Sequence, residues 1–354
     1  MSRIIFGLVV LLLCTGIAAH AQVTEWETLN SEAVSLYRQG HYDRAIIMAK
    51  KALQVAEQSK APNYSSVATS LNNLAVLYKT QGRYSQAEPL YKRALIIREK
   101  ALGPNHPDVA NSLNNLAELY RAQGQYAQAE PLYTRSLDIR EKVLGPDHPD
   151  VAASLNNLAV LYLSQDQYAQ AELLYKRSLL IWEKVLGPDH LNVAKSLNNL
   201  AELYRAQGRY AQAEPLYKRS LAIKEKVLGP AHPDVAASLN NLALQYYDQG
   251  EYAKAEPLYR RALTILEKAF GPVHPYLAKS LNNLALLYKT QGQYAQAEPL
   301  YRRALAIREK TLDPDHPDVA ESLENIAALY RETGREQAAQ LFEKRAAAIR
   351  AIKR

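Results

Sequence analysis

Pairs of adjacent asparagines recur every 42 residues, and they are the side chains of this sequence best suited to hold another chain. An asparagine amide offers two N–H donors and one oxygen acceptor, so a row of amides can bind the backbone of an extended peptide whatever its sequence. Asparagine also costs a helix roughly a few tenths of a kcal/mol relative to alanine. We therefore predict peptide-binding roles for Asn72 and Asn73, Asn114 and Asn115, Asn156 and Asn157, Asn198 and Asn199, Asn240 and Asn241, and Asn282 and Asn283.

A structural interpretation of the same pairs remains open. One asparagine of each pair, the second rather than the first, can instead bond the neighbouring repeat. Duplication of an ancestral unit would then copy the pair without any selection for binding.

Histidines also recur once per repeat, but their spacing argues against a shared metal site. Each lies in a linker, and successive linkers are about one helix pair apart, with helices packing ~8–10 Å from each other. A metal ion needs its ligands within ~2 Å, so we predict no metal and no other cofactor. We expect these side chains to satisfy or cap backbone groups. They are His106, His148, His190, His232, His274 and His316.

The near identity of the repeats argues against catalysis. An active site needs a nucleophile, an acid–base group and a stabilising group in one asymmetric place, and no single repeat carries a unique set. The sequence also has no glycine-rich phosphate loop. We therefore predict that the protein is not an enzyme. Residues 113–154 and 197–238 differ at only five positions, namely Gln125/Arg209, Thr134/Lys218, Asp138/Ala222, Arg140/Lys224 and Asp147/Ala231.

The elements that position these residues follow a repeated segment, Leu-Asn-Asn-Leu-Ala. It begins at residues 71, 113, 155, 197, 239 and 281, and degenerate copies begin at residues 29 and 323. Eight units at one period indicate a stacked repeat array rather than separate compact domains. We expect the array to occupy residues 22–354.

Each repeat is predicted to form two helices joined by a tight turn. In the second repeat, Leu71, Leu74, Ala75 and Tyr78 follow one another at helical spacing and form one buried stripe. Gly82 then ends the first helix, since the C-terminal position of a helix favours left-handed backbone. A Pro-Asp pair opens most first helices, because proline suits the first helical position and an acid suits the positive end of the helix.

The spacing of small and aromatic residues resembles the signature of the tetratricopeptide repeat. In the second repeat the matching residues are Leu74, Ala75, Tyr78, Gly82, Tyr84, Ala87, Tyr91 and Ala94. The 42-residue form, with Leu-Asn-Asn-Leu-Ala and Gly-Pro-Asp-His-Pro-Asp, is similar to the repeats of kinesin light chain and its bacterial relatives. The resemblance implies an all-α fold, a right-handed α-solenoid of eight helix-turn-helix tetratricopeptide repeats. For function it implies a family of peptide- and protein-binding scaffolds.

In tetratricopeptide arrays the first helices line the concave surface, so the resemblance implies that the asparagines face a groove. Four cations on this face complete the predicted binding residues: Lys79, Arg121, Arg205 and Lys289. Two of them follow a glutamate by three residues, and we expect Glu118 with Arg121, and Glu202 with Arg205, to pair. The remaining charge predicts a mildly cationic groove and an extended, somewhat acidic ligand with an apolar anchor. Apolar patches are expected at Val76, Val160, Leu163, Leu244 and Leu286.

The N-terminal segment is predicted to be a secretory signal peptide, residues 1–21. Arg3 precedes the apolar run Ile4–Ile17, and Ala19-His20-Ala21 supplies a small-x-small cleavage site. The apolar run is shorter than the ~20 residues of a spanning helix, so a retained anchor is the weaker alternative. We expect an exported protein, periplasmic or secreted, with no stable membrane span in the mature chain. Because kinesin light chain is cytosolic, its motor-cargo role is not carried over.

Charge and composition restrict the partners further. The net charge is only +7 over 354 residues, and no basic stripe carries interleaved exposed aromatic residues, so no nucleic-acid partner is predicted. We expect a monomeric, non-enzymatic scaffold that binds an extended peptide or partner protein in its concave groove. The alternative is an architectural protein that assembles end to end. The polar last helix, near residues 337–353, favours the scaffold because it suits a capped end.

Overall fold

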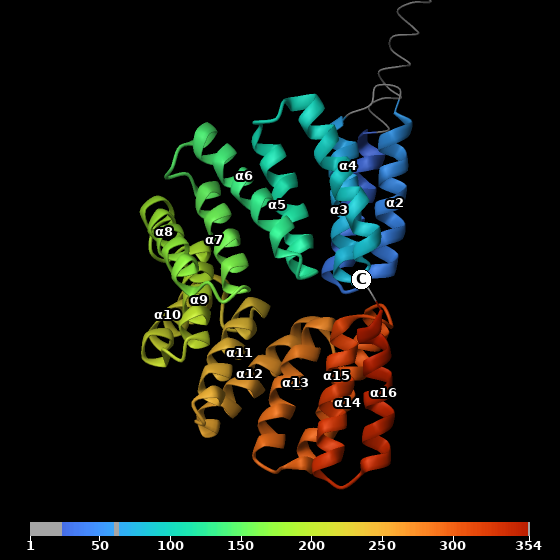
Figure 1. Ribbon diagram of the computed structural model, residues 1–354, viewed down its shortest axis with the longest axis vertical. Helices are drawn as coiled ribbons and strands as arrows, with labels where there is room; N and C mark the ends of the chain where they lie inside the picture. Colours follow the sequence, from blue (N-terminus) through green and yellow to red (C-terminus); the bar gives the residue numbers. More distant parts are fainter. Residues whose placement is uncertain (1–22, 60–63, 353–354) are drawn as a thin grey trace, which may run out of the picture. The chain divides into compact units, whose positions relative to one another are not determined.

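The structure, a computed structural model, describes residues 23–59 and 64–352, and all regular structure in these ranges is helical (Figure 1). The chain divides into two compact units, residues 1–119 and 120–354. The first contains a helix at residues 23–38, α2 (Tyr42–Gln58), α3 (Tyr64–Thr80), α4 (Tyr84–Leu102) and most of α5 (Pro107–Ala122). The predicted signal peptide, residues 1–21, lies outside the described residues.

The second unit holds the other helices in an alternating order. Its first helices are α7 (Pro149–Leu163), α9 (Leu191–Ala206), α11 (Pro233–Asp248), α13 (Pro275–Thr290) and α15 (Pro317–Glu332). Its second helices are α6 (Tyr126–Leu144), α8 (Tyr168–Leu186), α10 (Tyr210–Leu228), α12 (Tyr252–Phe270), α14 (Tyr294–Thr311) and α16 (Glu336–Ala351). Each first helix packs against the second helices before and after it. The predicted all-α repeat fold is confirmed.

Histidine side chains begin the first helices. The Nδ1 atom of His148 accepts a hydrogen bond from the backbone N–H of Asp150 at 3.1 Å, and Pro149 occupies the first turn. The capping role predicted for the linker histidines is confirmed, because each of them accepts the same bond. The distances for His106, His190, His232, His274 and His316 lie between 3.0 and 3.2 Å.

The turn inside each repeat contains a residue in left-handed backbone geometry. Gly208 has φ of 70°, and in the fourth repeat Asp166 adopts φ of 56° at the corresponding position. Aspartate tolerates this geometry better than most residues because its short polar side chain can bond locally. Asp166 therefore takes the place of the turn glycine in this repeat.

Tyrosines and alanines fill the interior of the second unit. The ring of Tyr217, on α10, is 1% exposed and belongs to one cluster with Tyr204 of α9 and Leu242 of α11. Ala201 and Ala213 are fully buried in the same cluster, where their small side chains let neighbouring helices approach closely. The repeated tyrosines thus belong to the core, as expected.

Buried or half-buried cations join second helices to the next first helix, a feature that was not predicted. The guanidinium of Arg308, on α14, donates to Ser322 Oγ at 2.7 Å and to the carbonyl oxygen of Asp318 at 2.8 Å. Three other repeats contain the same link, from Arg98 to Ser112, Arg140 to Ser154 and Lys224 to Ser238. At the corresponding positions Trp182 and Leu266 replace the cation, so the link between repeats is not uniform.

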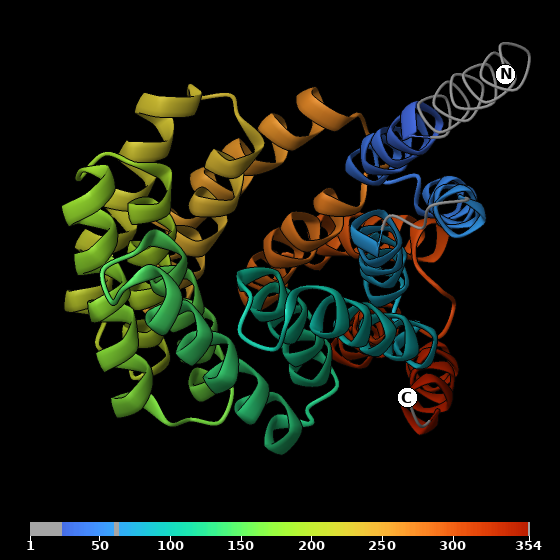
Figure 2. The same ribbon diagram turned by 90° about the horizontal axis from the view of Figure 1, so that it is seen from above.

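The first helices of the second unit also touch one another. Contacts join α7 to α9, α9 to α11, α11 to α13 and α13 to α15, whereas the second helices between residues 120 and 352 make no comparable contacts with one another. Figure 2 shows the helices of this unit from a second direction. First helices therefore lie closer together than second helices do. The free side of the first helices is the side towards which the unit curves. We call it the inner face, and its residues include Val160, Glu202, Leu244 and Leu286.

The last helix is polar on the side where a further repeat would pack. Glu343 stands where the preceding second helices have the buried tyrosine, and its two carboxylate oxygens accept bonds from Arg331 at 2.6 and 2.7 Å. Ala347 stands where they have leucine. Such a polar end is typical of a terminal repeat.

Candidate functional site

The asparagine pairs link successive first helices. In the second unit, Asn199 Nδ2 donates to Asn156 Oδ1 at 2.9 Å, and Asn241 Nδ2 donates to Asn198 Oδ1 at 3.0 Å. In the first unit the same bond joins Asn73 to Asn30 and Asn115 to Asn72, each at 2.7 Å. The structural interpretation, with the second asparagine bonding the neighbouring repeat, is thus observed. Contact with a ligand stays a prediction, because each amide has a second N–H group.

Burial differs along the row of asparagines. Asn156, Asn240 and Asn282 are only 5–6% exposed, which leaves them little surface for a ligand. Asn240 also bonds Ser280 Oγ at 2.7 Å, at the repeat boundary where Leu266 replaces the buried cation. The amides with surface to offer a ligand are the partly exposed ones, Asn72, Asn73, Asn114, Asn115, Asn157, Asn198, Asn199, Asn241 and Asn283.

Three of the four predicted cations of the inner face lie against acids of the next repeat. Arg205 forms an ion pair with Asp248, and Lys289 with Glu332 at 3.0 Å. The pairing predicted between Glu202 and Arg205 is wrong, because the guanidinium of Arg205 forms its ion pair with Asp248 on the adjacent first helix instead.

The first unit shows the same pattern. There Lys79 lies 3.9 Å from Glu118 of the following first helix. These pairs neutralise three of the four cations on which the prediction of an acidic ligand rested. Arg121 lies near the buried ring of Tyr175, whose pKa is raised by burial and by Glu202 and is partly lowered by Arg121.

Apolar side chains lie beside these polar groups on the inner face. Val160 and Leu163 of α7, Leu244 and Tyr247 of α11, and Leu286 of α13 are all partly exposed. They pack by one side against the core and offer the other side to solvent. The inner face of the second unit therefore combines amides with apolar patches.

The other side of the repeats carries a dense set of structural bonds. Glu172, on α8, accepts bonds from Tyr204 and Arg209 at 2.9 Å and pairs with Lys176 at 2.7 Å. Burial alone would raise the pKa of Glu172, but these hydrogen bonds outweigh it and lower the pKa to about 2. This carboxylate joins repeats four and five, which accounts for its low pKa without an acid–base role.

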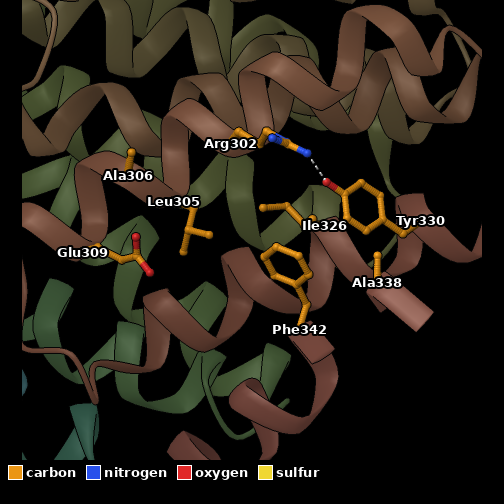
Figure 3. A pocket seen from close by; sticks show the side chains of 8 residues that line it. All are labelled: Arg302, Leu305, Ala306, Glu309, Ile326, Tyr330, Ala338 and Phe342. Carbon is orange, nitrogen blue, oxygen red and sulfur yellow. Dashed lines mark hydrogen bonds between the residues drawn. The ribbon is translucent and has the colours of Figure 1, made fainter. Parts of the chain in front are cut away.

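A cavity of about 310 Å³ lies between α14, α15 and α16 (Figure 3). Leu305 and Phe342 line it, and Arg302 donates to the Tyr330 hydroxyl at 2.6 Å along one wall. Ala338 also lines it, where preceding repeats have glutamine or lysine, so the shorter side chain opens this space. None of the predicted binding residues lines the cavity.

A smaller cavity, of about 60 Å³, lies in the first unit between the helix at residues 23–38 and α3. Val34, Tyr37 and Val76 line it together with Asn73. An apolar hollow therefore adjoins one of the predicted amides.

In residues 23–59 and 64–352, no group of histidine, cysteine, aspartate or glutamate side chains is arranged to hold a metal ion. None of the helices there is long and apolar enough to cross a membrane.

Comparison with known families identifies the class of protein. The family model described as Tetratricopeptide repeat matches residues 27–100, 66–142, 108–179, 165–226, 193–268, 234–310 and 280–351. The chain therefore belongs to the tetratricopeptide repeat family, as its repeated motif predicted. This fold generally mediates protein–protein interaction. The search of curated proteins found no match to the chain.

Several solved structures are similar. BtubC (BKLC) from P. vanneervenii is 26% identical, with a TM-score of 0.51 over 65% of this chain and 90% of that one. A putative kinesin light chain from Podosopora anserina with nearly identical TPR-like repeats is 31% identical, with a TM-score of 0.48 over 58% and 97%. A Rap protein complexed with Competence and Sporulation Factor shares the fold at 16% identity, with a TM-score of 0.60 over 92% and 98%.

Proposed function

We propose that this protein is a non-enzymatic scaffold that binds an extended segment of a partner protein along the inner face of its first helices. The observation that supports this most is the composition of that face in the second unit. Partly exposed amides lie there beside partly exposed apolar side chains on α7, α11 and α13. Amides can bond a peptide backbone, and apolar patches can bury its side chains.

Two further observations agree with a binding role. The Rap structure contains this fold together with Competence and Sporulation Factor, so the fold is compatible with holding a second molecule. The repeated carboxylates of the outer side, such as Glu172, are occupied by bonds between repeats. The inner face instead presents partly exposed amides next to partly exposed apolar side chains.

We also propose that the scaffold is monomeric. The last helix replaces the buried tyrosine of the other repeats with Glu343, so a further repeat would have to bury a carboxylate that bonds Arg331. Burying a charge without a full set of partners is costly. Sedimentation of the purified protein should give a single small species, and long polymers would favour the alternative of an architectural, self-assembling protein.

Export is a separate proposal, which rests on the sequence of residues 1–21 alone. The native protein should begin at Gln22, because Ala19-His20-Ala21 is a small-x-small cleavage site. Mass spectrometry of the intact protein from the periplasmic or culture fraction checks this. A chain that retains Met1, or one that carries a lipid on Cys14, would refute it.

The role of the amides can be tested at Asn198, which is partly exposed and accepts a bond from Asn241. Changing Asn198→Asp keeps an oxygen for Asn241 but removes the N–H donors that a peptide backbone would use. We expect the affinity for a partner recovered by pull-down to fall about twofold to tenfold, the value of one net hydrogen bond.

The variant Asn198→Ala is the matched comparison, since it removes the link between repeats as well. If Asn198 serves only that link, alanine alone should lower the melting temperature, and the folded aspartate variant should bind the partner as tightly as the parent does. That outcome would remove the amides from the proposed binding surface.

A further inference from the structure

One row of residues crosses the inner face of the second unit at a single level of the helices. Its members are spaced by 42 residues and lie on α7, α9, α11 and α13: Val160, Glu202, Leu244 and Leu286. Three are partly exposed apolar side chains, and the second is an exposed carboxylate. We call this set the inner row.

Glu202 is the unusual member of the inner row. Within the described part of the chain it forms no ion pair, since Arg205 is occupied by Asp248. The charge of Glu202 also acts on the hydroxyls beneath it: burial raises the pKa of Tyr217, and Glu202 raises it further. Lys195, the other exposed charge of α9 on this face, lies about two helical turns away.

The spacing of the row fits an extended chain. Neighbouring first helices are in contact, and packed helices lie ~8–10 Å apart. A polyproline II chain rises ~3.1 Å per residue and has three residues per turn, so every third side chain points the same way at ~9 Å intervals. One turn of such a ligand therefore spans one repeat.

We infer that the inner row selects an extended ligand segment with a basic residue between apolar residues, at intervals of three. In order along the row, the ligand residues are apolar, basic, apolar and apolar, facing Val160, Glu202, Leu244 and Leu286. This inference rests on the proposed function and adds the chemical class of the segment. The inferred ligand is basic rather than acidic at this position, because Arg205 and Lys289 pair with acids of the next repeat and Glu202 has no ion pair.

The experiment uses the full-length protein and labelled synthetic peptides of about ten residues, long enough for four side chains at every third position. The parent peptide carries leucine, lysine, leucine and leucine at these positions, with alanine and proline between them. A second peptide has glutamate in place of lysine, and both are also made in the reverse order because chain direction is open. Fluorescence anisotropy gives the affinities.

For one of the two orders we expect the lysine peptide to bind about threefold to fivefold tighter than its glutamate counterpart, the value of one partly exposed ion pair. The variant Glu202→Gln should abolish this preference, and Glu202→Lys should invert it. Both variants should fold like the parent, because Glu202 has no ion pair to lose. As a matched control, Asp138→Lys on α6 changes an exposed carboxylate outside the inner face and should leave the preference unchanged.

A preference that persists in Glu202→Lys, or an absence of peptide binding in both orders, overturns the inference. Neither result decides the proposed function, which is judged separately by whether inner-face variants weaken binding of the native partner.

Discussion

Replacing Tyr217 with alanine should lower the free energy of unfolding by about 3–5 kcal/mol, the cost of truncating a buried aromatic ring. The ring is 1% exposed and lies between α9, α10 and α11, so alanine would leave a cavity at the junction of two repeats. Chemical denaturation followed by far-UV circular dichroism measures the change. We expect the loss to be largest in repeats five and six, because repeats contact mainly their neighbours.

Two controls separate packing from the hydroxyl group. Tyr217→Phe keeps the ring and should retain most of the stability. Tyr64→Ala removes an exposed ring, 60% accessible at the start of α3, and should change the free energy by less than about 1 kcal/mol. If Tyr217→Ala lowered the free energy of unfolding no more than Tyr64→Ala does, the buried tyrosines of the second helices would not form the core of the array.

Replacing Arg308 with alanine should cost about 2–4 kcal/mol and release the last repeat. The guanidinium is 6% exposed and satisfies both Ser322 Oγ and the carbonyl of Asp318 on α15. A charge-assisted hydrogen bond contributes ~1.5–3 kcal/mol, and alanine removes packing as well. Hydrogen exchange should show faster opening of α15 and α16, with α7 to α10 unchanged.

The chain itself supplies comparison residues for this experiment. Leucine occupies the corresponding position at Leu266, so Arg308→Leu should fill the space and recover part of the loss. Arg345→Ala breaks an exposed pair with Glu309 and should cost less than about 1 kcal/mol. Equal exchange in the parent and in Arg308→Ala would show that the buried cation does not hold the last repeat.

The fold was predictable because every repeat carries the same residue pattern. Buried positions, capping histidines and turn residues recur at one period, so chance matches average out, and even the exception at Asp166 follows from its backbone preference. The link from Arg308 to Ser322 was missed because its partners lie on different repeats. Its signal was present as an arginine or lysine followed by serine 14 residues later, and it recurs in other repeats.

The candidate site was less predictable than the fold. Spacing along one helix suggested that Glu202 would pair with Arg205, but the next first helix brings Asp248 closer to the guanidinium. The asparagines likewise bond across repeats rather than standing free. Both outcomes depend on the distance between neighbouring helices, which a local sequence pattern does not contain.

The central claim is that the inner face binds the partner, and substitutions that the repeats already contain test it most directly. Leu244→Glu introduces the residue found at this position in repeats three and five, and Leu163→Arg does the same for its own position. Leu180→Asp, on the outer side of α8, has its precedent at Asp138 in repeat three. All three variants should therefore fold like the parent.

Affinity for the native partner, measured by calorimetry on each folded variant, is the deciding quantity. Burying a leucine side chain contributes ~1.5–3 kcal/mol, so each inner-face variant should bind at least about tenfold more weakly, and Leu180→Asp should bind within about twofold of the parent. Undiminished binding by Leu244→Glu and Leu163→Arg, together with a loss in Leu180→Asp, would contradict the account and place the partner on the outer helices.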